Sequence, residues 1–411
     1  MPLMKNFNYI KLASALGVSS AGDGVRIVAI PLLGTAFTSN PLYISLLVVV
    51  NRLPWILFTL MSGFIADRFS RKYLMVGVDL VRGLLVLVFA ISIYFSVGGI
   101  FSISIVAFCL GVGETIFSTA NQGMLPDVVN KQDLAKANGT LFTIQSVVSN
   151  FLGPALGGVL FSVARWIPFL LDAISFFTAA TFVSRIQASD HSRNATSSRM
   201  MDAIKEGISW CQHRSVIMAL LSVMAVMNFA QSAIQSVLVL YVTNDLSLDP
   251  SWYGMIVSIA GIGAVLGGMI GPLVEHYIGF DRIMRLAVLA AIPIIAIVVW
   301  AYSPWLLAGA LFLNSFIGLL VSVMVATIRQ RVVPRSLAGR VASVQAFAAM
   351  GLSLPLGALL GGVIAAVFGV RSVFVFSLIV CSLLSILTAH VLSPKRLKAE
   401  LDRLALEAEE T

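Results

Sequence analysis

Four of the ionisable residues inside long apolar stretches of the first half of the chain could bind or control a proton: Asp23, Arg26, Arg52 and Glu114. A charge in apolar surroundings is costly unless it is paired, so each is a functional candidate. Asp23 and Arg26 are three residues apart and share one face of a helix. A carboxylate can take up and release a proton, whereas an arginine stays protonated. We expect Asp23 to bind a proton in one state and to pair with Arg26 or Arg52 in another; the alternative is a neutralised pair with a purely structural role.

Other charges within apolar stretches receive different predictions. Asp79 and Arg82 are also three apart, and we expect them to form a structural pair. Asp172 stands near the end of its stretch, where water can reach it, and no role is assigned to it. Glu114 is the second candidate for proton uptake, with a structural hydrogen bond as the alternative.

The composition indicates which class of protein must position these residues. The chain has 411 residues, of which 58% are hydrophobic and 11% are charged, against roughly 25% charged in soluble domains. Backbone groups in lipid must be satisfied within each segment, so the apolar runs predict an all-α polytopic membrane protein. They are far longer than the strands of roughly ten residues in a membrane β-barrel, which excludes that fold.

Apolar runs separated by polar breaks predict twelve spans in two bundles of six helices. The predicted spans are 9–37, 42–66, 73–96, 100–124, 139–163, 166–186, 215–243, 251–277, 283–302, 304–327, 340–368 and 370–392. The expected domains are an N-terminal bundle over 1–186, a cytoplasmic linker over 187–214, a C-terminal bundle over 215–393 and a cytoplasmic tail over 394–411. The leucines of the tail stand among charges and predict an amphipathic helix.

The distribution of basic residues predicts the orientation. Of the 27 lysines and arginines, three lie well inside spans (Arg26, Arg52 and Arg82), and only Arg165 and Arg371 lie at the loops on one side. All others face or flank the opposite side, which also holds both termini and the linker. By the positive-inside rule that side is cytoplasmic. The net charge of +8 is therefore explained by basic residues that set the orientation in the membrane, and no nucleic-acid partner is expected.

The two halves repeat each other in their fifth spans. GPALGGVLFSVAR runs from Gly153 to Arg165, and PLGALLGGVIAAVFGVR runs from Pro355 to Arg371. Repeated halves of six spans are typical of transporters in which one half rocks against the other around a central site.

The loop GFIADRFSRK, residues 63–72, carries a family resemblance. It resembles the signature G-x-x-x-D-R-x-G-R-R between spans two and three of the major facilitator superfamily, with Ser70 at the second glycine. A weaker copy, GPLVEHYIGFDR, occupies residues 271–282. The residues expected to form a cytoplasmic latch are Gly63, Asp67, Arg68, Arg71, Lys72 and Asp127.

In the latch that this resemblance implies, Asp67 caps a helix of the opposite half and Arg71 pairs with Asp127. Carboxylates are favoured at helix N-termini, and opposite charges hold an interface shut until its balance shifts. The alternative is a positive anchor needed only for topology, to which Asp67 would contribute nothing.

Within the superfamily the chain is similar to the branch of macrolide, enterobactin and other drug exporters. The similarity rests on GDGV at 22–25, ANQGMLPDVV at 120–129 and LAGRVASVQAF at 337–347. It implies a proton-driven exporter of amphipathic small molecules in the cell membrane, and no enzyme. Many members carry an arginine on span four where Gly111 stands here, which makes Glu114 the plausible replacement. A siderophore, lipid or metabolite exporter is the first alternative, and a non-transporting receptor or scaffold the second.

The glycine-rich segment of span five resembles an antiporter motif, with Ser149 in place of an expected glycine. Its residues are Gly153, Pro154, Gly157 and Gly158. The alternative interpretation is close helix packing through small residues. GIGAVLGG, at residues 261–268, lies inside an apolar span with no preceding strand, so it is not a nucleotide-binding loop.

A polar face on the seventh span predicts a substrate cavity, although residues packed between helices would follow the same pattern. The predicted lining comprises Met227, Asn228, Gln231, Gln235, Asn314 and Gln345. The three cysteines are far apart and form no C-x-x-C pair, so no metal site is expected. No cofactor or catalytic residue is expected; the partners are protons, lipid and a small-molecule substrate, and the protein is expected to be a monomer.

Overall fold

A computed structural model describes residues 6–187, 208–333 and 347–389, together with the single residues 337, 341, 344, 345, 393, 397 and 403. Twelve helices in these ranges are long and apolar enough to cross a membrane, which confirms the all-α fold class. Most of the predicted linker, most of the predicted tail and the side chain of Asp67 lie outside the described residues, whereas Gly63 lies in the helix Pro41–Arg68.

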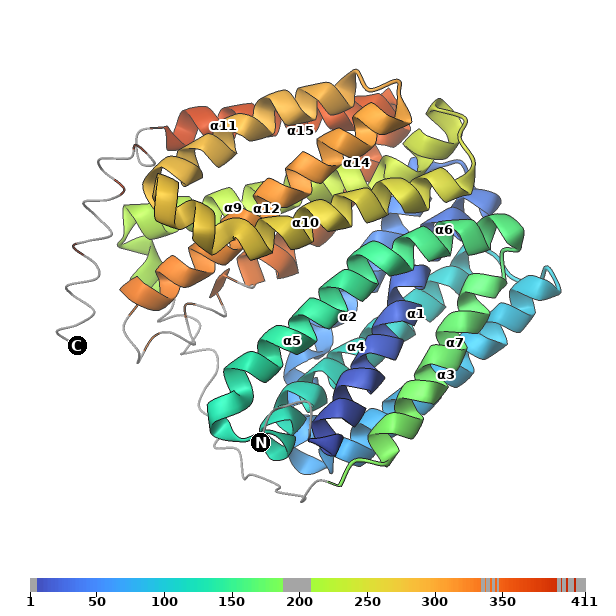
Figure 1. The fold of residues 1–411 in the computed structure, drawn as a ribbon. Helices are drawn as coiled ribbons and strands as arrows, with labels where there is room; N and C mark the ends of the chain where they lie inside the picture. The colour runs from blue at the N-terminus through green and yellow to red at the C-terminus, as the bar shows by residue number, and fades with distance from the viewer. Residues whose placement is uncertain are drawn as a thin grey trace. The chain divides into compact units, whose positions relative to one another are not determined.

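The first six spans are α1 (Phe7–Phe37), α2 (Pro41–Arg68), α3 (Arg71–Tyr94), α4 (Ile100–Val128), the continuous stretch of α5 (Leu134–Val147), η3 (Val148–Leu152) and α6 (Gly153–Val163), and α7 (Ile167–Ser184). The second six are α9 (Ser215–Leu240) with η4 (Tyr241–Asp245), α10 (Pro250–Ile278), α11 (Phe280–Val299), α12 (Pro304–Val332), η5 (Phe347–Leu352) with α14 (Ser353–Phe368), and α15 (Val370–Thr388). Figure 1 shows both sets.

Contacts group the described residues into two compact units. The first contains those of Met1–Ala195 and Leu238–Gly261, and the second those of Thr196–Val237 and Ile262–Thr411. In the first unit α1 packs against α6 and α7, α3 lies against α4 and α7, and α2 pairs with α4. In the second unit α11 packs against α12 and α15. The candidate charges of the first half therefore lie within one unit.

Two glycines flanking Asp23 explain how closely α1 approaches its neighbours. A Cβ at Gly22 would lie 2.5 Å from the Oδ1 atom of Asp172 on α7, and one at Gly24 would lie 2.8 Å from the carbonyl oxygen of Ser149. Both distances are too short for a side chain. The GDGV sequence thus sets α1 between two helices and fixes the position of Asp23.

The two glycine-rich spans share a local structure. Each is preceded by a π-helical turn, η3 in the first unit and η5 in the second. Each then places glycines against backbone oxygens: a Cβ at Gly157 would lie 2.5 Å from the oxygen of Val25, and one at Gly357 would lie 2.2 Å from that of Phe229. A π-helical turn reorients the helix face that follows it, so the sequence repeat corresponds to a structural one.

Candidate functional site

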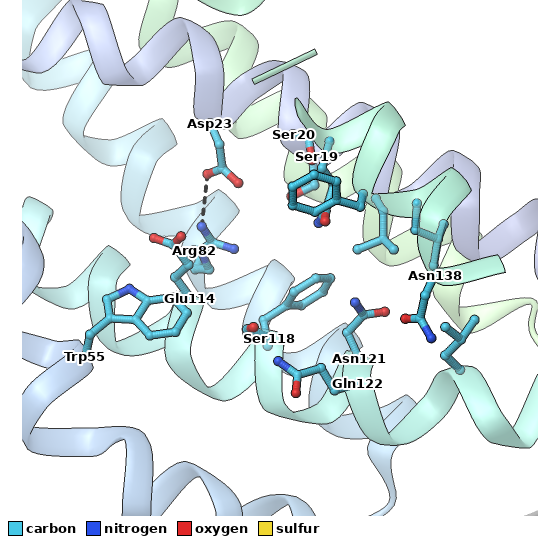
Figure 2. Close-up of a pocket in the computed structure, with 16 residues that line it drawn as sticks. Ser19, Ser20, Asp23, Trp55, Arg82, Glu114, Ser118, Asn121, Gln122 and Asn138 are labelled. Carbon is cyan, nitrogen blue, oxygen red and sulfur yellow. Dashed lines mark hydrogen bonds and ion pairs between the residues drawn. The ribbon is translucent and has the colours of Figure 1, made fainter. Parts of the chain in front are cut away.

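The first unit contains a cavity of about 360 Å³ (Figure 2). Its wall comes from α1, α2, α3, α4 and the α5 segment, and polar side chains alternate on it with apolar and aromatic ones. The polar lining residues are Ser19, Ser20, Asp23, Arg82, Glu114, Ser118, Asn121, Gln122, Asn138 and Gln145. The apolar ones are Leu16, Trp55, Phe117, Leu125, Leu141 and Phe142. Such a lining suits an amphipathic organic molecule.

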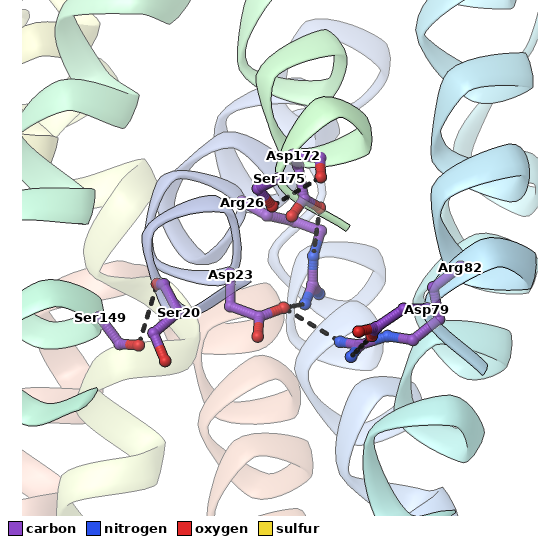
Figure 3. A network of polar contacts seen from close by, with 8 residues as sticks. All are labelled: Ser20, Asp23, Arg26, Asp79, Arg82, Ser149, Asp172 and Ser175. Atoms are coloured by element: carbon purple, nitrogen blue, oxygen red, sulfur yellow. Dashed lines mark hydrogen bonds and ion pairs between the residues drawn. The ribbon is translucent and has the colours of Figure 1, made fainter. Parts of the chain in front are cut away.

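A charged network extends from this cavity into the unit (Figure 3). Asp23 accepts hydrogen bonds through Oδ1 from both Arg26 and Arg82, the latter at 3.0 Å. Arg26 also donates from Nε to Asp172 Oδ2 at 2.8 Å. Asp79 lies 3.9 Å from Arg82. The two arginines therefore tie together carboxylates from α1, α3 and α7.

Burial distinguishes the members of this network. The side chain of Asp23 is 24% exposed, whereas those of Asp79 and Asp172 are fully buried, and both arginine side chains are at most 5% exposed. The guanidinium of Arg82 lies 4.1 Å from the centroid of the Phe176 ring, which supports it as a cation–π contact. Asp23 is thus the network carboxylate that reaches the cavity, as Figure 2 shows.

The structure brings together most of the predicted proton-coupling residues. Asp23 and Arg26 are paired as expected, and Glu114 lines the same cavity. The second arginine on Asp23 is Arg82, while Arg52 is exposed on α2. The sequence predicts that Arg82 pairs with Asp79 alone, because spacing along one helix does not reveal contacts with another helix.

Asp172 belongs to the network and is not reached by water. The sequence alone assigns it no role. Its side chain is fully buried against Arg26, and Ser175 donates to its backbone oxygen. Its place in the outer third of α7 suggested contact with water. The close approach of Gly22 instead covers it with α1.

The stretch 63–72, predicted as a loop, is mostly helical: α2 continues to Arg68 and α3 begins at Arg71, so only Phe69 and Ser70 lie between the helices. The start of α3 carries an ion pair of the predicted latch. Arg71 donates to Asp127 and to the carbonyl oxygen of Gly123, each at 2.8 Å. A Cβ at position 123 would lie 2.6 Å from Arg71 Nε, so the glycine of ANQGMLPDVV gives the guanidinium its place. Arg68 is exposed, and Lys72 lies over the ring of Tyr73. The latching role itself stays a prediction.

The span-five glycines contact helices on two sides within the first unit. Gly153 and Gly157 face Gly24 and Val25 of α1, whereas Gly158 faces Gly254 at the start of α10. Pro154 contributes its backbone oxygen, 2.4 Å from a Cβ built at Gly254. Close packing is therefore present, and the antiporter role of the motif stays a prediction.

Most of the polar residues predicted to line a substrate cavity in the second unit are hydrogen-bonded to other side chains or to backbone. Asn314 donates to Gln231, and Asn228 donates to the oxygen of Ala349 at 2.9 Å. Gln345 is buried and contacts Arg329 and the sulfur of Met224. Gln235 is exposed and Met227 is half-buried. Their role in binding substrate stays a prediction.

Neither unit groups potential metal ligands in its described residues: no three His, Cys, Asp or Glu side chains are arranged to hold a metal ion there. The site's chemistry is consequently that of carboxylates, guanidiniums, amides and aromatic rings.

Comparison with known proteins identifies the family. The profile of the transmembrane secretion effector family, within the major facilitator superfamily, matches residues 2–409. The chain belongs to this family. It is a transporter-type, multi-pass membrane protein with twelve spans in its described residues, and its relatives are transporters, not enzymes.

Three curated relatives cover most of the chain. The multidrug efflux pump Tap of Mycolicibacterium fortuitum is 25% identical over 87% of this chain and 88% of its own length. Macrolide efflux protein A of Streptococcus pyogenes is 24% identical over 88% of this chain and 92% of its own. The uncharacterized MFS-type transporter YkuC of Bacillus subtilis is 25% identical over 87% and 86%.

Solved structures share the fold at low identity. The nucleoside transporter NupG matches with a TM-score of 0.74 at 12% identity, over 95% of this chain and 99% of its own. A bacterial homologue of the human lysosomal transporter Spinster matches with a TM-score of 0.72, also at 12% identity, over 96% and 98%. These similarities confirm the major facilitator fold.

Proposed function

We propose that the protein exports drug-type amphipathic small molecules across the cell membrane in exchange for protons, by alternating access. The observation that carries the proposal is the cavity of the first unit, which is lined both by aromatic side chains and by the partly exposed carboxylate of Asp23. The names of the efflux relatives Tap and macrolide efflux protein A support the direction and the substrate class.

Coupling follows from the position of Asp23. Its carboxylate accepts hydrogen bonds from two guanidiniums, those of Arg26 and Arg82. A proton that arrives through the cavity removes the carboxylate's charge and weakens both bonds, so that α1 and α3 lose the ion pair between Asp23 and Arg82, while the Arg26–Asp172 pair between α1 and α7 remains. Binding of a substrate in the same cavity and binding of a proton to Asp23 then disfavour each other, which is the condition for exchange of one for the other.

Glu114 provides a second carboxylate on the cavity wall, on α4. It acts electrostatically on Arg26, so its protonation changes the same network without a direct bond to it. We assign to it the recognition of substrate charge or the uptake of a second proton.

The loop between α2 and α3 acts as the cytoplasmic latch in this proposal. Arg71 and Asp127 hold that loop to the end of α4, and Asp67 is the residue through which it would engage the opposite half. Both termini are cytoplasmic in the orientation that the basic loops favour. The two bundles 1–186 and 215–393 are the moving bodies, in a monomer.

Export of a siderophore, lipid or metabolite is the alternative within the same fold, and the polar residues of the second unit bear on it. If Gln231 and Asn314 line the substrate path, Asn314→Ala will change the order of preference among transported compounds. If their bond only packs α9 against α12, the variant will lower thermal stability and leave that order unchanged.

The decisive experiment is flux in proteoliposomes with an imposed pH gradient. The probes are a macrolide, a cationic dye, a phospholipid and a catecholate siderophore. Wild type is compared with Asp23→Asn and Glu114→Gln, and Asp133→Asn, which lies outside the cavity lining, is the matched control. We expect gradient-driven flux of the first two probes, lost in Asp23→Asn and retained in the control.

Two results would contradict the proposal. If both cavity variants keep proton-coupled flux, neither carboxylate couples transport to protons. If no probe responds to the gradient in wild type, proton exchange is the wrong mechanism.

A further inference from the structure

Asp79 occupies an unusual position behind the cavity. It lies on α3 with no exposed surface, and no hydrogen-bond donor among the described residues reaches either of its carboxylate oxygens. The nearest cation is Arg82 at 3.9 Å, beyond hydrogen-bond distance. An ionised carboxylate without hydrogen bonds in such a place is costly by several kcal/mol, and a neutral carboxylic acid is much less so.

The charges around Asp79 point the same way. Arg82 lies on its own helix, Asp23 and Arg26 face the network from α1, Asp172 faces it from α7, and Glu114 lies on α4. Two arginines therefore face four carboxyl groups. Arginines keep their protons, so the buried region has an excess of negative charge unless it holds a proton.

The geometry of Arg82 connects Asp79 to the cavity. Asp79 and Arg82 share one face of α3, and Nη2 of Arg82 bonds Asp23 while its Nη1 points to Asp79 (Figure 3). The side chain of Arg82 crosses α4 at Gly113, where a Cβ would lie 2.8 Å from Arg82 Cδ. Its Nε atom also lacks a hydrogen-bond partner among the described residues. A small rotation of the Arg82 guanidinium would break its hydrogen bond to Asp23 and form one to Asp79.

We propose that Asp79 is a buried proton-binding site, and that Arg82 exchanges between Asp23 and Asp79 according to which of them holds the proton. With Arg82 on Asp23, Asp79 is the protonated acid. When a proton bonds to Asp23 from the cavity, Arg82 turns to Asp79. The O–H bond of Asp79 breaks, its electron pair stays on the carboxylate that Arg82 now pairs, and the proton passes to bulk water. One proton enters and one leaves, so the charge of the network is unchanged. This inference rests on the proposed function only for its use in transport.

The test measures protonation directly in the purified full-length protein. A protonated carboxyl group has an infrared carbonyl band that neither a carboxylate nor an asparagine side chain shares. Near neutral pH we expect this band in wild type and its loss in Asp79→Asn. We also expect its loss in Asp23→Asn, because that change frees Arg82 to ionise Asp79. Asp133→Asn, outside the network, is the control and should keep the band.

Other outcomes would overturn the proposal. If the band survives in Asp79→Asn, or is absent from wild type, Asp79 does not hold the proton. If it disappears instead in Asp172→Asn, the proton belongs to the other fully buried carboxylate, whose Oδ1 is also without a hydrogen bond. If it survives in Asp23→Asn, Arg82 does not switch. Since the band is read without flux, failure of the transport proposal would leave these results interpretable.

Discussion

Replacement of Gly157 by alanine should destabilise the first unit, because this glycine lies against the backbone of α1. The new Cβ would lie 2.5 Å from the carbonyl oxygen of Val25, about 0.9 Å short of the 3.4 Å at which ordinary contact begins. Neither atom belongs to a flexible side chain, so α6 and α1 must separate. Overpacking of this kind typically costs about 1–3 kcal/mol.

A matched variant, Gly139→Ala, should stabilise the protein instead of destabilising it. Gly139 also lies on span five, but nothing stands within 4 Å of the position that an alanine Cβ would occupy there. Alanine at this site removes only the helix penalty of glycine, a gain of up to about 1 kcal/mol. Thermal unfolding of the two purified variants in detergent should therefore move the midpoint in opposite directions, by roughly 2–4 °C per kcal/mol.

One result would refute the packing argument. If Gly157→Ala unfolds at the wild-type temperature or above it, while Gly139→Ala behaves as expected, the contact between α1 and α6 is not tight. Because that contact also fixes the register of Asp23 beside the cavity, a destabilised but folded Gly157→Ala protein should bind substrate more weakly than the Gly139→Ala control.

Two further predictions concern charges at or beyond the ends of the spans. The backbone N–H of Ser251 and the hydroxyl of Ser162 hold the pKa of Asp249 below its usual value. The ionised Asp249 carboxylate should contribute its full stabilisation above the usual carboxyl pKa and lose it as pH falls through the lowered pKa. The difference in melting temperature between wild type and Asp249→Asn should therefore vanish in acid. A difference that stays constant with pH would contradict this prediction. Loss of the half-exposed Arg71–Asp127 pair in Arg71→Ala should cost at most about 1 kcal/mol yet alter flux by several-fold; unchanged flux would argue for a topological anchor.

Much of the fold could be predicted from the sequence, since the number and positions of the spans depend on local composition. A span needs roughly twenty apolar residues to cross the hydrocarbon. Asn40 and Pro41 begin α2, and Gly369 separates α14 from α15. The pairing of Asp23 with Arg26 was predictable as well, because a spacing of three residues brings both side chains to one helix face.

The cavity and its network required the tertiary structure. Trp55, Asn121 and Asn138 come from three separate helices, and nothing in their own sequence neighbourhoods indicates that they face one space. The twelve-span pattern leaves the rotation of each helix open, because apolar residues surround most of each span.

The sequence by itself determined that charges lie within the spans, that glycines flank Asp23, and that the chain repeats its fifth span. Only the tertiary structure decided that Arg82, and not Arg52, is the second partner of Asp23, and that Asp79 and Asp172 are buried behind it. The physical reason is that an ion pair between helices depends on their rotation and neighbours. Close backbone contacts between helices, such as that between Gly24 and Gly153, determine both the rotation of each helix and which helices are its neighbours.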